Sequence, residues 1–431
     1  MRHPRSTLLT GLAAASALTL AACSGGGGDS GGDDTPDGPV DLRMTVWTAS
    51  EDHLELFNDI ADTYIADHPD EVSSVTFETV PFDDYTTTLT TQIAGGNAPD
   101  LAWIFESNGP EFVASGALMD LGPTFEATDG YDLEDVDPAT LELWQSDGGL
   151  YAYPFSNSPF VMFVNTDRVS ESGQDNPADL LADGEWTYDA ARDISAGSVD
   201  ELGGAGLVVR DFDYQIWSNL ATVWGGWDAE PWSADGSTCE FGSQEMIDAL
   251  SWYHDAVFED GAIPGPGTSA DFFAGDTTMT ITQISRASSL DGSFEWDIVP
   301  LPAGPAGQQN VVGQAGLGVL ANSEHPEAAA NFLAYFTNPE NSESLALYFP
   351  PPRTSLLNPE TLAEGNPLFS QEQLQTVVDS ITGATTKPAH PNFAQLDTAV
   401  RSALDPLWTA DADAASVAPA VCTDIESLLQ G

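Results

Sequence analysis

The stretch from Gln92 to Leu101 constrains the fold most strongly, because it combines a helix end, a turn and the start of a strand. Before it, large apolar side chains recur at helical spacing, which predicts an amphipathic helix with the stripe Phe82, Tyr85, Leu89 and Ile93. The Gly95-Gly96 pair then supplies a left-handed stop, and Pro99 cannot continue a helix. The apolar run 101–105 therefore predicts a strand that is buried on both faces.

Polar residues follow directly after this predicted strand, at Glu106 and Ser107. Upstream, 41–47 alternates like a strand, a helical stripe follows, and 75–80 is a second candidate strand. The run predicts parallel strands joined by helices, and in such sheets ligands bind beyond the carboxyl ends of the strands. Glu106 and Ser107 are thus candidates for binding, with a solvated loop as an equally simple interpretation.

The turn at Pro99-Asp100 and the later Gly116-Ala117-Leu118 resemble the first domain of bacterial extracellular solute-binding proteins. Within that family the likeness is specifically to the sugar-binding class that includes maltose-binding proteins. Further segments arrive in the order typical of the class: Gly149–Phe155, Glu185–Tyr188 with Thr187 as a helix cap, Asp213–Trp227, Phe272–Met279, Trp296–Pro302 and Pro350–Arg353.

This resemblance implies an α/β, periplasmic-binding-protein-like fold, with two α/β lobes joined by three crossings and a ligand cleft between them. The first lobe is expected to comprise 41–151 plus 303–336. The second is expected to comprise 156–299 plus 340–431. It also implies a monomeric receptor that hands its ligand to the permease subunits of an ABC importer and uses no cofactor.

The first residues look like a processing signal. Arg2 and Arg5 precede an apolar run that ends in Leu20-Ala21-Ala22-Cys23, which resembles a bacterial lipobox. We expect a signal peptide over 1–22 and a lipid-anchored tether over 23–40, with Cys23 lipidated on the outer face of the cell membrane. An ordinary buried Cys23 is the alternative, although the Gly-, Asp- and Ser-rich tether offers it nothing to pack against.

Acidic residues dominate the charge balance. The chain has 68 Asp and Glu against 10 Lys and Arg, a formal net charge of −58, and Lys387 is its single lysine. This balance disfavours nucleic-acid partners. Since the acids are spread over the whole chain, a uniformly acidic surface explains them better than a site for a cation.

Added salt should stabilise this protein, because the self-repulsion of a highly charged surface weakens when ions screen it. We expect the melting temperature to rise between low and high NaCl concentration. A melting temperature that is independent of NaCl would contradict the prediction.

Two further cysteines, Cys239 and Cys422, complete the total of three. In an exported protein such a pair suggests a disulfide, with two buried free thiols as the alternative. Closing a loop of this length would contribute on the order of 4 to 5 kcal/mol in the chain-entropy model.

A sugar site needs flat aromatic rings for C–H faces, and amides, carboxylates or guanidinium groups for hydroxyls. The resemblance places such groups on both lobes, and the expected ligand-binding residues are Trp47, Glu51, Asp52, Glu106, Ser107, Tyr214, Trp217, Trp224, Arg286, Gln314 and Arg353. For each aromatic residue the alternative is a place in the core. Maltose-type receptors carry a tryptophan near the position of Ser285, and its absence puts that particular sugar in doubt.

The two arginines of this set, Arg286 and Arg353, stand out because arginine is scarce here. Each is either a structural ion pair or a bidentate ligand for hydroxyls or a carboxylate.

Two other function classes deserve comparison. A secreted glycoside hydrolase would need two facing carboxylates, and with 68 acids such pairs in the sequence prove nothing. No His-Glu-x-x-His motif is present, so we expect neither a zinc enzyme nor another metal site. A polyamine receptor would need a carboxylate-rich cleft, which the arginines disfavour. We therefore expect a binding protein and not an enzyme.

Overall fold

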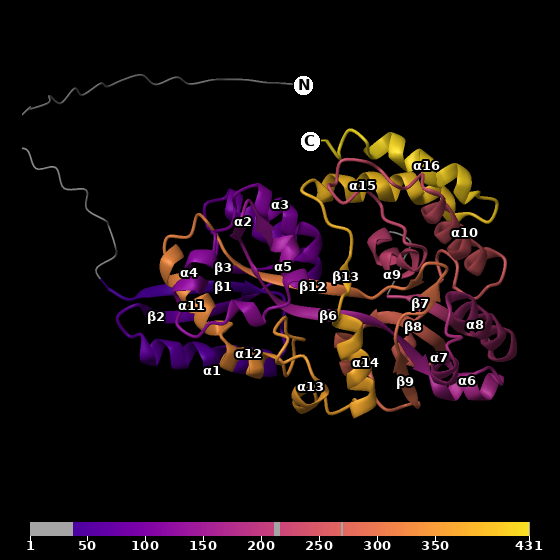
Figure 1. Cartoon of the computed structure of the whole chain (residues 1–431), viewed down its shortest axis with the longest axis horizontal. Coiled ribbons are helices and arrows are strands. Elements are labelled where there is room, and N and C mark those ends of the chain that lie inside the picture. Colours follow the sequence, from indigo (N-terminus) through magenta and orange to yellow (C-terminus); the bar gives the residue numbers. More distant parts are fainter. Residues whose placement is uncertain (1–37, 211–215, 269, 431) are drawn as a thin grey trace, which may run out of the picture. The chain divides into compact units, whose positions relative to one another are not determined.

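The computed structural model describes residues 38–210, 216–268 and 270–430, and a nine-stranded mixed sheet runs through them (Figure 1). The strand order is β2-β1-β3-β12-β6-β8-β7, with β13 beside β12 and β9 beside β6. The strands of this sheet are β1 Val40–Val46, β2 Val72–Thr79, β3 Leu101–Phe105, β6 Tyr153–Asn165, β7 Ala205–Val209, β8 Thr277–Gln283, β9 Trp296–Val299, β12 Val311–Val319 and β13 Thr385–Thr386. Two small hairpins add β4 Gln145–Ser146 with β5 Gly149–Leu150, and β10 Ala303–Gly304 with β11 Gly307–Gln308.

Helices connect and cover these strands. They are α1 Glu51–Asp67, α2 Tyr85–Ala94, α3 Gly109–Ala114, α4 Gly122–Ala127, α5 Pro138–Leu141, α6 Thr166–Ser172, α7 Pro177–Asp183, α8 Tyr188–Leu202, α9 Ala221–Trp224, α10 Gln244–Phe258, α11 Pro326–Phe336, α12 Pro339–Leu345, α13 Pro359–Gly365, α14 Gln371–Ile381, α15 Phe393–Leu404 and α16 Ala414–Ile425. Thr187 caps α8 by accepting a hydrogen bond from the Ala190 N–H, as the sequence predicted. In the described segments, no helix combines the length and apolar character that a bilayer span requires.

The predicted parallel run is confirmed, since β1 pairs in parallel with both β2 and β3. The second strand starts at Val72, three residues earlier than its alternation suggested. The predicted helix before the Gly-Gly turn is shorter than expected, because α2 begins at Tyr85 and Phe82 lies in a preceding 3₁₀ turn with 52% of its surface exposed. Gly96 supplies the left-handed turn, with φ +70°.

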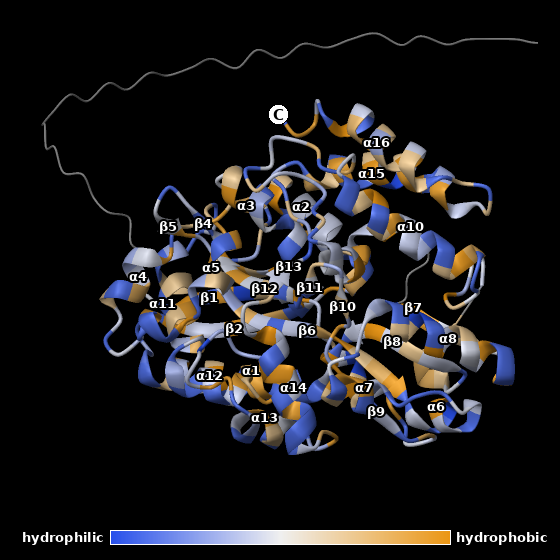
Figure 2. Cartoon of the chain, turned by 45° about the vertical axis from the view of Figure 1, so that its right-hand side comes forward, coloured by the Kyte–Doolittle hydropathy of each residue, from blue (hydrophilic) through white to orange (hydrophobic). Residues whose placement is uncertain are grey.

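Strands β6 and β12 are each shared between separate hydrophobic cores. The first core gathers residues of 42–155 and 315–349, including the beginning of β6 and the end of β12. The second gathers residues of 160–311 and 393–429, and a smaller third core packs α14 against β6. Figure 2 shows the matching hydropathy, because helices such as α8 mix apolar and polar residues.

A buried polar chain joins the two long strands. The Trp144 indole N–H donates to Gln314 Oε1 at 2.6 Å, and the Gln314 amide donates to Asn157 Oδ1 at 2.7 Å. Gly316 makes room for the indole, since a Cβ there would lie 2.6 Å from the Trp144 ring. Gln314, which was predicted to contact ligand, is 3% exposed, and its side-chain amide already bonds both Trp144 and Asn157.

Candidate functional site

Three aromatic rings meet at the carboxyl ends of β1 and β3. Trp47 follows β1, and its ring stacks on Phe105 with centroids 4.3 Å apart and planes 19° apart. Phe82 meets both rings edge-on, at 6.1 Å from Trp47 and 4.7 Å from Phe105. Trp47 and Phe105 are half-buried, whereas Phe82 is exposed. We call Trp47, Phe82 and Phe105 the aromatic platform, because they offer apolar ring surface at the end of the sheet where α/β proteins bind ligands.

Buried neighbours hold the platform in place. Tyr85 and Trp103 contact the Trp47 ring edge-on, with centroids at 5.1 and 4.7 Å. The Tyr85 hydroxyl donates to the Thr45 carbonyl at 2.8 Å, and burial raises the pKa of Tyr85 well above its usual value. Tyr85 and Trp103, each about 1% exposed, therefore hold the Trp47 ring of the platform in place.

An ion pair lies next to the platform. Glu106 directly follows Phe105 and is 5% exposed, and the Lys387 ammonium lies 3.0 Å from its Oε1. The same ammonium lies 6.0 Å from the centroid of the Phe160 ring. Strand β12 brings the two residues together, since it pairs with β3 at Phe105 and with β13, which ends one residue before Lys387. The single lysine of the chain is thus a candidate site residue, which its rarity in the sequence could have indicated.

The remaining predicted residues of the first loops lie close by in the chain. Ser107 is half-buried in the 3₁₀ turn Glu106–Asn108. Glu51 and Asp52 are exposed in the first turn of α1, where Ser50 caps the helix and acidic residues suit the helix dipole. Of the predicted residues, Trp47 belongs to the platform, and Glu106 belongs to the ion pair and directly follows the platform residue Phe105 in the chain.

The two tryptophans predicted to stack on ligand lie in the second core. Trp217 is 1% exposed and Trp224 is 2% exposed, and their ring centroids lie 6.0 Å apart. Trp217 also contacts Phe241 and Phe393, each at 6.1 Å. The expectation that these rings reach ligand is replaced by a core role, because the apolar spacing of the segment reflects packing. Tyr214 falls outside the described residues, as does Cys23.

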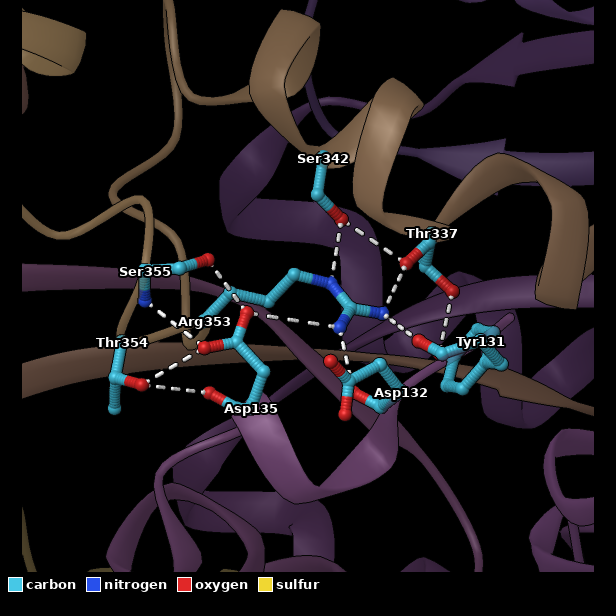
Figure 3. A network of polar contacts seen from close by, with 8 residues as sticks. All are labelled: Tyr131, Asp132, Asp135, Thr337, Ser342, Arg353, Thr354 and Ser355. Carbon is cyan, nitrogen blue, oxygen red and sulfur yellow. Dashed lines mark hydrogen bonds and ion pairs between the residues drawn. The ribbon is translucent and has the colours of Figure 1, made fainter.

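Arg353 is wholly interior, so the expectation that it lies at the rim of a cleft is wrong (Figure 3). Its guanidinium donates to the carbonyls of Asp132 at 2.8 Å, Tyr131 at 2.8 Å and Thr337 at 3.1 Å. Asp135 lies 3.9 Å from the same group. Burial alone would raise the pKa of Asp135, but hydrogen bonds from neighbouring hydroxyl and N–H groups, together with Arg353, lower it overall. Its Nε also donates to the Ser342 hydroxyl of α12 at 3.3 Å, so Arg353 ties α12 to the segment after α4.

Arg286 lies after β8 and contacts the ring of Phe273. It is half-buried in the 3₁₀ segment Ile284–Ser289 after β8, and its guanidinium carbon lies 5.3 Å from the Phe273 ring centroid. Phe273 packs against the third core. This cation–π contact gives Arg286 a structural partner.

Two cavities among the described residues have linings that contain no platform residue. One of about 530 Å³ lies near the end of α1, lined by His68, Glu71, Asp129 and Tyr335 among others. Glu71 bonds the start of β1 through Val40, so this cavity lies about 20 Å from the other end of that strand, where Trp47 follows. A smaller cavity of about 40 Å³ borders β6 at Ser156 and Ser158. In 38–210, 216–268 and 270–430, no cluster of His, Cys, Asp or Glu is arranged to hold a metal ion.

Comparison with known proteins decides the family. A family model described as "Bacterial extracellular solute-binding protein" matches residues 59–369. The chain belongs to this family. The resemblance found in the sequence motifs is thereby confirmed, and so is the fold class, because solved solute-binding proteins superpose on most of the chain.

Three similar proteins give this solute-binding protein its context. The arabinooligosaccharide-binding protein of Halalkalibacterium halodurans is 24% identical over 76% of this chain and 75% of its own. A Streptomyces antibioticus protein described as an uncharacterized lipoprotein is 25% identical over 79% of this chain and 75% of its own. The ABC substrate-binding protein of Listeria monocytogenes in complex with cycloalternan has a TM-score of 0.78, with 20% identity over 91% of this chain and 99% of its own.

Proposed function

We propose that this solute-binding protein is the receptor of an ABC importer and that it binds a sugar or oligosaccharide at the aromatic platform. The observation that carries the proposal is the stacked pair of Trp47 and Phe105 beside the Glu106–Lys387 ion pair. Flat rings suit the C–H faces of a sugar, and charged donors and acceptors suit its hydroxyls. The same ligand class is supported by the Halalkalibacterium protein, which is named for arabinooligosaccharide binding, and by the Listeria protein, which was solved in complex with cycloalternan.

The proposed motion is closure of two lobes, 41–151 plus 303–336 and 156–299 plus 340–431. Separate cores at the two ends of β6 and β12 support two bodies, because a hinge needs two rigid bodies joined by few strands. The first core extends to Phe349 and the second includes Val311, so the cores place both boundaries several residues away from this division. Ligand that contacts both lobes would select the closed form, which the permease subunits would recognise. In this scheme the platform belongs to the first lobe and Lys387 to the second.

We also propose that Cys23 carries a lipid and tethers the protein to the outer face of the cell membrane. Support comes from the lipobox-like Leu20–Cys23 sequence and from membership of an extracellular family. The Streptomyces relative is also described as a lipoprotein. Mass spectrometry of the membrane-extracted protein tests this: a diacylglyceryl mass on the peptide beginning at Cys23 is expected, and an unmodified Cys23 would overturn it.

The receptor is proposed to release its ligand unchanged. Maltotetraose and arabinotriose incubated with the purified protein should keep their chromatographic profiles. The appearance of shorter sugars would instead favour a glycoside hydrolase.

Replacing Trp47 with alanine should weaken sugar binding by about 1 to 3 kcal/mol, because the variant loses the ring surface on which the sugar stacks. Isothermal titration calorimetry with the neutral sugar that the wild type binds most tightly measures the loss. Trp296 provides a matched control, since it is also half-buried but packs on Phe369 beside the third core. Trp296→Ala should leave affinity unchanged, and equal losses in both variants would contradict the assignment.

A further inference from the structure

The polar group beside the platform is an ion pair assembled from distant parts of the chain. Glu106 comes from the end of β3, and Lys387 from the segment between β13 and α15. The side chain of Glu106 is 7% exposed and that of Lys387 is 19% exposed. The carboxylate is thus almost wholly withdrawn from water, whereas the lysine keeps some contact with it.

An uncompensated carboxylate at this place would favour cationic ligands. The Phe160 ring, whose centroid lies 6.0 Å from the ammonium position, would add cation–π attraction for an amine, and the acidic chain as a whole attracts cations. In this structure the Lys387 ammonium occupies the position that a ligand amine would take against Glu106, at 3.0 Å. The pair as a whole carries no net charge.

We infer that Lys387 determines which ligand charge the site accepts: by neutralising Glu106 at the edge of the aromatic platform, it makes the site select uncharged, hydroxyl-bearing molecules over amines. The inference rests on the proposed function and narrows its ligand class to neutral sugars. An ammonium has three N–H donors and a carboxylate two acceptor oxygens, so a single contact between them leaves groups of both kinds for sugar hydroxyls.

Lysine is suited to this role by geometry as well as charge. The preceding strand β13 is held against β12 at Val311 and Val312, so the backbone on the amino side of Lys387 is fixed by the sheet. Its ammonium also lies over the Phe160 ring, which restrains the side chain from the second core. The position of the positive charge is therefore set before any ligand arrives.

Lys387→Met, Glu106→Gln and the double variant test the inference by calorimetric titration with maltotetraose, the glucosamine tetramer and spermidine. Lys387→Met should bind the two amines at least about tenfold more tightly than the wild type does, since the amine can now pair with Glu106. In the double variant this gain should disappear, because neither charge is left. A gain that persists in the double variant, or its absence in Lys387→Met, would overturn the inference.

The outcomes separate this inference from the proposed function. A wild type that binds none of the neutral sugars tested would count against the sugar receptor, whatever the variants do with spermidine. A purely structural role for Lys387 would lower the melting temperature of Lys387→Met and weaken all probes alike. Such a uniform loss, with an unchanged ratio of amine to neutral-sugar affinity, would also overturn the inference.

Discussion

Replacing Trp217 with alanine is expected to lower the free energy of unfolding by about 3 to 5 kcal/mol and to leave ligand affinity intact. The indole is 1% exposed and is enclosed by Trp224, Trp232, Phe241 and Phe393. Truncation removes its buried surface and leaves a cavity that these rings cannot fill without moving. Urea denaturation measures the loss of stability, and titration at a temperature where the variant is folded measures affinity.

Phe82→Ala supplies the opposite case for comparison. Phe82 is 52% exposed and belongs to the platform, so its loss should change the urea midpoint little and weaken sugar binding. If Trp217→Ala instead weakened binding at an unchanged urea midpoint, Trp217 would have to reach the ligand and its core assignment would be wrong.

Removing the disulfide is expected to be the second large loss, at about 4 to 5 kcal/mol in the chain-entropy model. Cys239 and Cys422 are bonded across 183 residues of sequence. The bond fastens α16, whose residues Ala418 and Val421 lie in the second core, to the segment before α10. Without it the unfolded chain gains the conformations that the cross-link forbids.

Urea denaturation of a Cys239→Ser/Cys422→Ser variant, and of the wild type with and without reductant, measures this contribution. Reductant should lower the midpoint of the wild type to near that of the variant, while the variant itself should not respond. The prediction would be contradicted if the urea midpoint of the wild type were the same with and without reductant, in a reduced sample whose thiols are shown to be free.

Local sequence patterns predicted elements well because those elements depend on neighbours along the chain. The Gly95-Gly96 stop, the Pro99 break and the run 101–105 act within a few residues of one another and predicted β3. The alternation of 41–47 and the candidate strand 75–80 predicted β1 and β2, and the three strands are parallel as expected. Family motifs added the two-core arrangement that periodicity alone would not have indicated. The prediction that Phe82 belongs to the helix was wrong, because the apolar spacing extends about one turn upstream of Tyr85, where α2 begins.

The site was harder to predict because its members come from distant segments. Arg353 bonds the carbonyl of Asp132, 221 residues away, and scarcity of arginine says nothing about whether such a residue lies inside or at a surface. Lys387 lies near Glu106 because β12 pairs with the strands that precede both residues. These are β3, which ends at Phe105, and β13, which ends at Thr386. Aromatic residues show the same limit, since Trp47 and Trp217 are the same residue type, yet one is half-buried in the platform and the other lies in the core.

The most direct test of the central claim is a thermal-shift screen of the purified protein in high salt. The panel holds mono- and oligosaccharides together with polyamines and amino acids. Ligand that binds only the folded state raises the melting temperature by mass action, so the account predicts a rise with at least one class of neutral sugar. If no sugar raised the melting temperature while spermidine raised it clearly, the result would contradict the sugar receptor and favour a receptor for cations.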